Sequence, residues 1–334
     1  MKILLKYISI IIIIIISVEI RLTKQNQNFA ELKNIIDAHI DWVTSVATLS
    51  NGHLASGSND RSIKIWNPNN GSLIQTLTGH TDWLTSLAVL PNGYLASGSY
   101  DKSINIWNTE DGSLIRTLTG HTSTVYSLAV LPNGYLASGS ADKSIKIWNP
   151  SDGSLERTLT GHISSVYSLA VLSNGHLASG SDYWDTSIKI WNPEDGSLTR
   201  TINGHTDSVE SLAVLPNGHL ASGSADKSIK IWNPEDGSLQ RTLNGHTDWI
   251  RSLAVLPNGH LASGSDDRSI KIWNPEDGSL KRTLTGHTKV VLSLAVLSNG
   301  YLASGSADKS IKIWNPNDNS GLCRSCLLYT SRRG

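Results

Sequence analysis

Apolar and polar positions recur along this chain with a period of about 41 residues, and each copy predicts four short β-strands. In one copy, Ser86–Leu90 is a nearly continuous apolar run, which is typical of a strand buried on both faces. Asn92-Gly93 then predicts a tight hairpin, because both residues tolerate a positive φ. Tyr94–Ser99 predicts a second strand, and its small residues indicate that something bulky packs close to its backbone.

The second half of the same copy continues as strands. Ile104–Trp107 alternates, with its two isoleucines on one face and Asn105 and Trp107 on the other. A turn follows, and Leu114–Leu118 predicts a fourth strand. No segment has a helical period, so each copy predicts a four-stranded antiparallel meander. A copy of this size cannot bury its apolar face alone, so the seven copies must stack on one another.

The chain resembles the WD-repeat family of β-propellers. The resemblance rests on a Gly-His pair near the start of each copy, such as Gly120-His121, and on a Trp near its end, such as Trp148. It covers roughly residues 29–318 and implies an all-β, seven-bladed propeller of four-stranded antiparallel blades. Two features depart from the family pattern: Trp-Asn replaces Trp-Asp in every copy, and the first pair is Ala38-His39. We expect the Asn to cap the turn that follows it through its side chain.

Residues 30–37 predict how the ring closes. Leu32 and Ile36 precede His39 at the spacing that Leu73 and Leu77 keep from His80, so they predict a fourth strand without a blade of its own. The last copy loses the pattern of a fourth strand after Trp314. The N-terminal strand can therefore complete the seventh blade, which is how the family typically seals its ring and protects its sheet edges.

Each copy also contains a His, a Ser and an Asp, the residue types of a hydrolase catalytic triad. The resemblance implies instead that these residues and the Trp form a buried hydrogen-bonded tetrad, and seven copies of a catalytic site would have no chemical use. We therefore predict no catalytic residues, no metal site and no cofactor. The predicted tetrads are His39, Ser56, Asp60, Trp66; His80, Ser97, Asp101, Trp107; His121, Ser138, Asp142, Trp148; His162, Ser179, Asp185, Trp191; His205, Ser222, Asp226, Trp232; His246, Ser263, Asp267, Trp273; and His287, Ser304, Asp308, Trp314.

The fourth copy is two residues longer than its neighbours. Counting back from Trp191 gives Asp185 as the tetrad acid, whereas counting forward from Ser179 gives Tyr183, which cannot serve. We choose Asp185, with Asp182 as the fallback, and expect Tyr183 and Trp184 to be pushed out of the turn.

The copies differ mainly three and five residues after the His and just before the turn Asp, and the family resemblance places these positions around one mouth of the central channel. Clustered exposed aromatic residues suit a binding surface; the alternative is neutral drift after duplication, with the aromatics half-buried against neighbouring blades. The predicted partner-binding residues are Trp42, Thr44, Trp83, Tyr100, Tyr126, Tyr167, Tyr183, Trp184, Glu210, Trp249, Arg251 and Asp266.

Charge narrows the kind of partner. The formal net charge is zero, 17% of residues are charged, and no basic stripe suggests a nucleic acid. At the variable positions Glu210 and Asp266 oppose Arg251 and Lys289, which favours an amphipathic or extended segment over a strongly basic or acidic peptide. We therefore expect a monomeric, non-enzymatic interaction scaffold that binds a peptide or protein loop on the face around the channel.

Two alternatives to a self-standing scaffold remain. The propeller could be a targeting or regulatory module of a longer multidomain protein. More remotely, it could be an enzyme with its site in the channel. Against the enzyme, six of the first strands read Ser-Leu-Ala-Val-Leu, a stretch without ionisable residues.

The two ends of the chain fall outside the repeat. Residues 1–28 contain Lys2 and Lys6 before an uncharged run with isoleucine at every position from Ile10 to Ile16. This segment fits a signal peptide or anchor, a low-complexity extension, or an interfacial helix. Residues 319–334 are off the pattern, and their two cysteines, Cys323 and Cys326, lack a second pair at zinc spacing. Family and the absence of cysteines from the repeats favour the cytoplasm; the alternative is the secretory pathway or a membrane anchor through residues 1–20.

Overall fold

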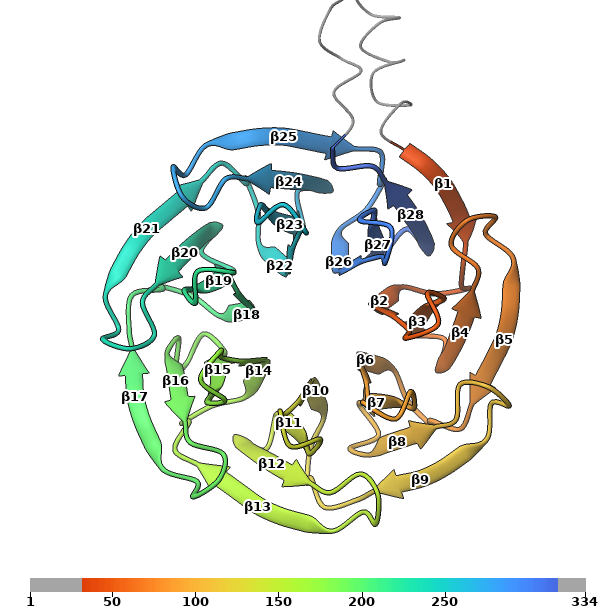
Figure 1. Cartoon of the computed structure of the whole chain (residues 1–334), viewed down its shortest axis with the longest axis horizontal. Helices are drawn as coiled ribbons and strands as arrows, with labels where there is room; N and C mark the ends of the chain where they lie inside the picture. The colour runs from red at the N-terminus through yellow and green to blue at the C-terminus, as the bar shows by residue number, and fades with distance from the viewer. Residues whose placement is uncertain (1–31, 318–334) are drawn as a thin grey trace, which may run out of the picture.

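The computed structural model describes residues 32–317, which form seven four-stranded antiparallel sheets arranged as blades around a central channel (Figure 1). The expected fold class, an all-β seven-bladed propeller, is confirmed. In each blade the four strands run outward from the channel in the order of the sequence, except that the last blade takes its outermost strand from the start of the chain.

The strands of the seven blades have nearly equal lengths. The innermost, first strands are β2 (Val43–Thr48), β6 (Leu84–Val89), β10 (Val125–Val130), β14 (Val166–Val171), β18 (Val209–Val214), β22 (Ile250–Val255) and β26 (Val291–Val296). The second strands are β3 (Leu54–Ser58), β7 (Leu95–Ser99), β11 (Leu136–Ser140), β15 (Leu177–Ser181), β19 (Leu220–Ser224), β23 (Leu261–Ser265) and β27 (Leu302–Ser306).

The outer half of each blade contains the other two strands. The third strands are β4 (Ser62–Trp66), β8 (Ile104–Trp107), β12 (Ser144–Trp148), β16 (Ile188–Trp191), β20 (Ser228–Trp232), β24 (Ser269–Trp273) and β28 (Ser310–Trp314). The outermost strands are β5 (Leu73–Thr78), β9 (Leu114–Leu118), β13 (Leu155–Thr160), β17 (Leu198–Ile202), β21 (Leu239–Asn244), β25 (Leu280–Thr285) and β1 (Leu32–Asp37).

The small residues of the second strand allow neighbouring blades to approach each other. Every residue of β11 is buried. A Cβ atom built on Gly139 would lie only 2.7 Å from Cγ1 of Val166, which belongs to the first strand of the next blade. The bulky neighbour that the sequence predicts for this strand is therefore the next blade, and a larger side chain at Gly139 would push the two sheets apart.

The apolar core is divided among the interfaces between blades. One cluster joins Leu131 and Ile145 of one blade to Val166 and Trp191 of the next, and equivalent clusters occur between the other neighbours. Hydroxyl groups add a polar link at most interfaces, as where Ser86 Oγ accepts a hydrogen bond of 3.1 Å from the backbone N–H of Leu128. Each blade is thus stabilised by its two neighbours, as in other repeat architectures.

The ring closes through the N-terminal strand, as the sequence predicts. β1 pairs antiparallel with β28, with Ile36 opposite Ile311, and Ile36 is buried in the apolar cluster between the last and first blades. On the channel side, the N–H of Val46 donates to Ser293 Oγ at 3.0 Å, and Thr48 Oγ1 donates to the carbonyl of Val296 at 2.9 Å. The first and last blades are therefore joined at both their inner and outer strands (Figure 1).

In the part of the chain that the structure describes, no helix is long and apolar enough to cross a membrane. The predictions for residues 1–28 and 319–334, including those for Cys323 and Cys326, lie outside the described residues.

Candidate binding site at the channel mouth

The predicted His, Ser, Asp and Trp residues are brought together in all seven blades. In the third blade, His121 Nδ1 lies 2.7 Å from Asp142 Oδ2, His121 Nε2 lies 2.7 Å from Ser138 Oγ, and Trp148 Nε1 donates to Ser138 Oγ at 2.8 Å. A carboxylate only accepts hydrogen bonds, so the imidazole donates from Nδ1 and accepts the Ser138 hydroxyl proton at Nε2. Across the seven tetrads, both histidine distances stay between 2.6 and 2.8 Å.

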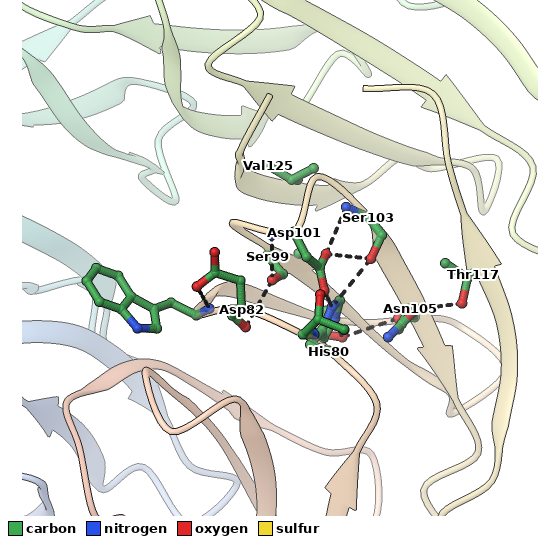
Figure 2. Close-up of polar contacts among 12 residues, drawn as sticks. His80, Asp82, Ser99, Asp101, Ser103, Asn105, Thr117 and Val125 are labelled. Carbon is green, nitrogen blue, oxygen red and sulfur yellow. Dashed lines mark hydrogen bonds and ion pairs between the residues drawn. The ribbon is translucent and has the colours of Figure 1, made fainter. Parts of the chain in front are cut away.

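The tetrad acid also organises the turn that carries it. Figure 2 shows Asp101 of the second blade between His80 and Ser103, whose hydroxyl donates to Asp101 Oδ1 at 2.6 Å. Burial alone would raise the pKa of Asp101, but the hydrogen bonds from His80 and Ser103 outweigh it and hold the pKa well below its ordinary value of 3.8. The buried hydrogen-bonding groups of the tetrad are thus paired within their own blade.

The longer fourth blade keeps the same tetrad. Asp185 Oδ2 lies 2.6 Å from His162 Nδ1 and is therefore the tetrad acid. The fallback residue Asp182 instead accepts a hydrogen bond of 2.7 Å from Ser164 Oγ. The backbone N–H of Asp182 donates to the carbonyl of Ser165, just as the N–H of Ala141 donates to the carbonyl of Thr124 in the third blade. Asp182 therefore corresponds to Ala141, and the two additional residues are Tyr183 and Trp184.

A β-bulge near the start of each first strand explains how the variable positions reach the channel. In every first–second strand pair the register shifts across one residue, such as Tyr126 between Val125 and Ser127. Val125 is fully buried between blades, and the additional residue leaves Tyr126 free to point elsewhere. The seven bulge residues are Thr44, Thr85, Tyr126, Tyr167, Glu210, Arg251 and Leu292.

All seven bulge residues line one cavity of about 690 Å³ at the channel mouth. Ten of the twelve predicted partner-binding residues are in its lining; Trp184 and Asp266 are not. The full lining is Trp42, Thr44, Asn59, Trp83, Leu84, Thr85, Tyr100, Tyr126, Tyr167, Tyr183, Asp207, Ser208, Glu210, Trp249, Arg251 and Leu292. A cavity of this volume, with mixed aromatic and polar walls, has the size and character of a ligand site.

Aromatic rings form a continuous row along one side of this cavity. Trp83 meets Tyr100 with ring centres 5.4 Å apart, Tyr100 meets Tyr126 at 6.0 Å, and Tyr126 meets Tyr167 at 4.7 Å, all edge to face. Burial, reinforced by the negative charges of Glu210 and Asp182, raises the pKa of Tyr167 to about 12.

The charged side of the cavity is internally paired. Arg251 Nε and Nη2 each donate to one oxygen of Asp266 at 2.9 Å, and Nη1 donates to Glu210 Oε2 at 3.2 Å. The same guanidinium lies over the ring of Trp249, 4.4 Å from its centre. Lys289 is exposed and does not line the cavity. The sequence suggests a balance of two acids against two bases on this face; in the lining of the cavity, the one cation, Arg251, is shared between two carboxylates.

Several predicted or variable residues have roles that sequence alone does not show. Thr44 Oγ1 donates to the carbonyl of Leu84 in the next blade at 2.7 Å, so its hydroxyl joins blades. Leu84 lines the cavity although its position contains an aliphatic residue in every copy, and Asp207 lines it from a position that contains Asp in four of the seven copies. Ile40 and Ile163, which replace the usual Thr after the His, are 80% and 68% exposed; that replacement was the signal that could have drawn attention to them.

The repeats match a known family. The sequence profile described as "WD domain, G-beta repeat" matches residues 30–67, 71–108, 112–149, 153–192, 196–233, 237–274 and 278–315. The chain belongs to the WD-repeat family. Its members are typically protein-interaction scaffolds and usually non-catalytic.

Solved structures contain the same architecture. The chain is similar to the crystal structure of the WD40 β-propeller domain of Doa1, with 29% sequence identity and a TM-score of 0.78. That match covers 87% of this WD-repeat chain and 98% of the Doa1 domain chain. No curated protein matches the chain in sequence.

Proposed function

We propose that this WD-repeat propeller is a non-enzymatic scaffold that binds an extended peptide segment or a protein loop over the channel mouth. The observation that carries the proposal is the convergence of the seven bulge residues on one cavity. The backbone at these positions is nearly the same in every blade, but the seven positions contain five different residue types. The blades therefore place polar, charged, aromatic and aliphatic side chains around one cavity.

The rim of the cavity offers the side chains that dominate protein interfaces. Trp42, Trp83 and Trp249 are 43%, 44% and 38% exposed, although large aromatic residues on a monomer are normally covered. Each of the three lines the cavity, and each belongs to a different blade. Partly exposed tryptophans around a pocket can bury a large area on binding while losing little conformational freedom, which is why they are frequent hot spots.

The test is a selection of random 12-residue peptides displayed on phage, followed by affinity measurements with synthetic copies of the enriched peptides. We expect the triple variant with Trp42→Ala, Trp83→Ala and Trp249→Ala to lose binding by more than about 100-fold. Its melting temperature should change by no more than about 4 °C, because these side chains are largely outside the core.

The matched control removes an equal number of exposed apolar side chains from the outer strands. Leu73, Leu114 and Leu155 are 44–49% exposed and lie far from the mouth on β5, β9 and β13. Alanine at these three positions should leave peptide affinity unchanged. Equal affinity of the selected peptides for wild type and for the triple tryptophan variant would show that the binding site lies elsewhere.

A further inference from the structure

The cavity contains more negative than positive charge. Three charged residues line it, Asp207, Glu210 and Arg251. Arg251 is held by Asp266 in a two-point fork, an arrangement that matches one guanidinium to one carboxylate. Glu210 accepts a hydrogen bond from the same guanidinium through Oε2 at 3.2 Å, so the two acids share Arg251, the one cation that lines the cavity.

Glu210 lies where a bound side chain could reach it. It is the bulge residue of β18, beside the blade that contributes Tyr167, and both residues line the cavity. Only 12% of its side chain is exposed, and burial raises the pKa of its carboxyl despite the nearby Arg251. A carboxylate that has lost much of its hydration gains more from an incoming cation than an exposed one does.

The aromatic wall suits a cation as well. The cavity already contains one cation–π contact, because the guanidinium of Arg251 lies over the ring of Trp249. On the opposite side, the row of Trp83, Tyr100, Tyr126 and Tyr167 carries no cation among the described residues. The aromatic row and a carboxylate that shares its cation with Asp266 thus line the same cavity.

An anionic ligand is disfavoured by the same contacts. It would have to compete with Asp266 for the donors of Arg251 and would face Glu210 and Asp207 at short range. The other bases on this face do not line the cavity. They are Lys289, which precedes β26, and the bases of the turns between second and third strands, Arg61, Lys102, Lys143, Lys227, Arg268 and Lys309.

We propose that the mouth cavity receives a lysine or arginine side chain of the bound segment, with the cationic group between Glu210 and the tyrosine row. This inference rests on the proposed function and specifies the chemistry of the segment that the scaffold recognises. Of the amphipathic or extended segment that the sequence favours, it selects an extended segment and adds one basic anchor residue.

The peptides enriched by the selection described above provide the test. We expect a lysine or arginine at one fixed position in these peptides, and replacement of that residue by norleucine should weaken binding about tenfold or more, the size of one charge-assisted contact. The variant Glu210→Gln, which keeps the size of the side chain, should cause a loss of similar size. Its matched control is Glu235→Gln, which alters a carboxylate that accepts a hydrogen bond from Asn174 at the other end of the blades.

The outcomes separate this inference from the function on which it rests. Enriched peptides that lack a basic residue, have an acidic anchor, or bind Glu210→Gln as well as wild type would overturn the basic anchor; if they still lose binding to the triple tryptophan variant, the scaffold function stands. Peptides that bind the triple variant normally would overturn both. A selection that enriches no peptide would also count against both.

Discussion

The buried tetrads and the channel mouth lie a few residues apart in every blade, yet the tetrad residues are constant among the copies and the mouth residues vary. Ser138 of the tetrad and the bulge residue Tyr126 come from two strands that pair with each other. The tetrad residues are identical in all seven copies, whereas the bulge position contains Thr, Tyr, Glu, Arg or Leu. In the tetrad each side chain has a hydrogen-bond partner among the other three; at the bulge the constant feature is the backbone. The comparison teaches that residue types stay constant where side chains are hydrogen-bond partners of one another within each blade. They can vary, and with them the binding chemistry, where the fold requires only the backbone conformation.

The largest effect should come from breaking the ring, on which both regions depend. Deletion of residues 30–37 removes β1, which pairs with β28 and buries Ile36. We expect the deletion variant to oligomerise or lose its cooperative unfolding transition, because the edge of β28 becomes an open template for other chains. Size-exclusion chromatography with light scattering, together with thermal unfolding, measures both effects.

A pair of point variants controls for the loss of chain length. Ile36 is 4% exposed and Ile35 is 50% exposed on the same strand. Ile36→Asp should reproduce the effect of the deletion, because it places a charge in the apolar core, whereas Ile35→Asp should behave as wild type. A monomeric deletion variant with an unchanged melting temperature would contradict closure by this strand.

The next effect separates the tetrad from the mouth. Trp148→Ala should lower the free energy of unfolding by about 3–5 kcal/mol, because it leaves a cavity and removes the indole N–H that donates to Ser138. Trp249→Ala removes the same side chain from the mouth, where it is 38% exposed, and should cost less than about 1 kcal/mol. Chemical denaturation measures both, and equal losses would remove the distinction between the two regions.

Much of this comparison could be predicted from the sequence. The period, the spacing of Leu32 and Ile36 from His39, and the position of Asp185 relative to Trp191 are all properties of the order of residues along the chain. Strand pairing follows from them because each copy repeats the same local constraints, whereas the tetrads, and closure of the ring in the way typical of the family, are what the resemblance to WD-repeat propellers implies.

The arrangement of the cavity could not be predicted in the same way. The bulge that turns Tyr126 into the channel is a shift of register, which the apolar pattern of the strand does not encode. The pairing of Arg251 with Glu210 and Asp266 depends on distances across blades and between strands, and two acids and one base line the cavity where the sequence suggests a balance of charges. Composition counts charges, but only the structure shows which charges are already paired.

Acid should weaken the tetrads selectively. The pKa of the tetrad aspartates is held below the ordinary value of 3.8, so the unfolded chain binds more protons than the folded chain as the pH falls below about 4. This contribution to stability is complete above that pH and is lost below it, in seven blades together. Glu210 acts in the opposite direction, because its raised pKa gives a contribution that is lost as the pH rises from about 4.5, but it is one group against seven.

Denaturant unfolding at a series of pH values from 7 to 3 measures this dependence. We expect a steep loss of stability between about pH 4 and pH 3. Asp142→Asn should be less stable than wild type at pH 7 and should lose less stability on acidification, because one of the seven titrating groups is gone. A flat profile through this range would show that the tetrad carboxylates are not held ionised by their partners.

The smallest effect concerns the edge of the mouth, where the fourth blade adds Tyr183 and Trp184. Their rings are 4.4 Å apart, but only Tyr183 lines the cavity, and Trp184 is 69% exposed. Tyr183→Ala should weaken peptide binding several-fold, Trp184→Ala less than about twofold, and neither should change the free energy of unfolding by more than about 0.5 kcal/mol. Titrations of one selected peptide against both variants decide the matter. If Trp184→Ala has the larger effect, the bound segment extends beyond the cavity, and the neighbouring exposed Ile163 becomes the next position to test.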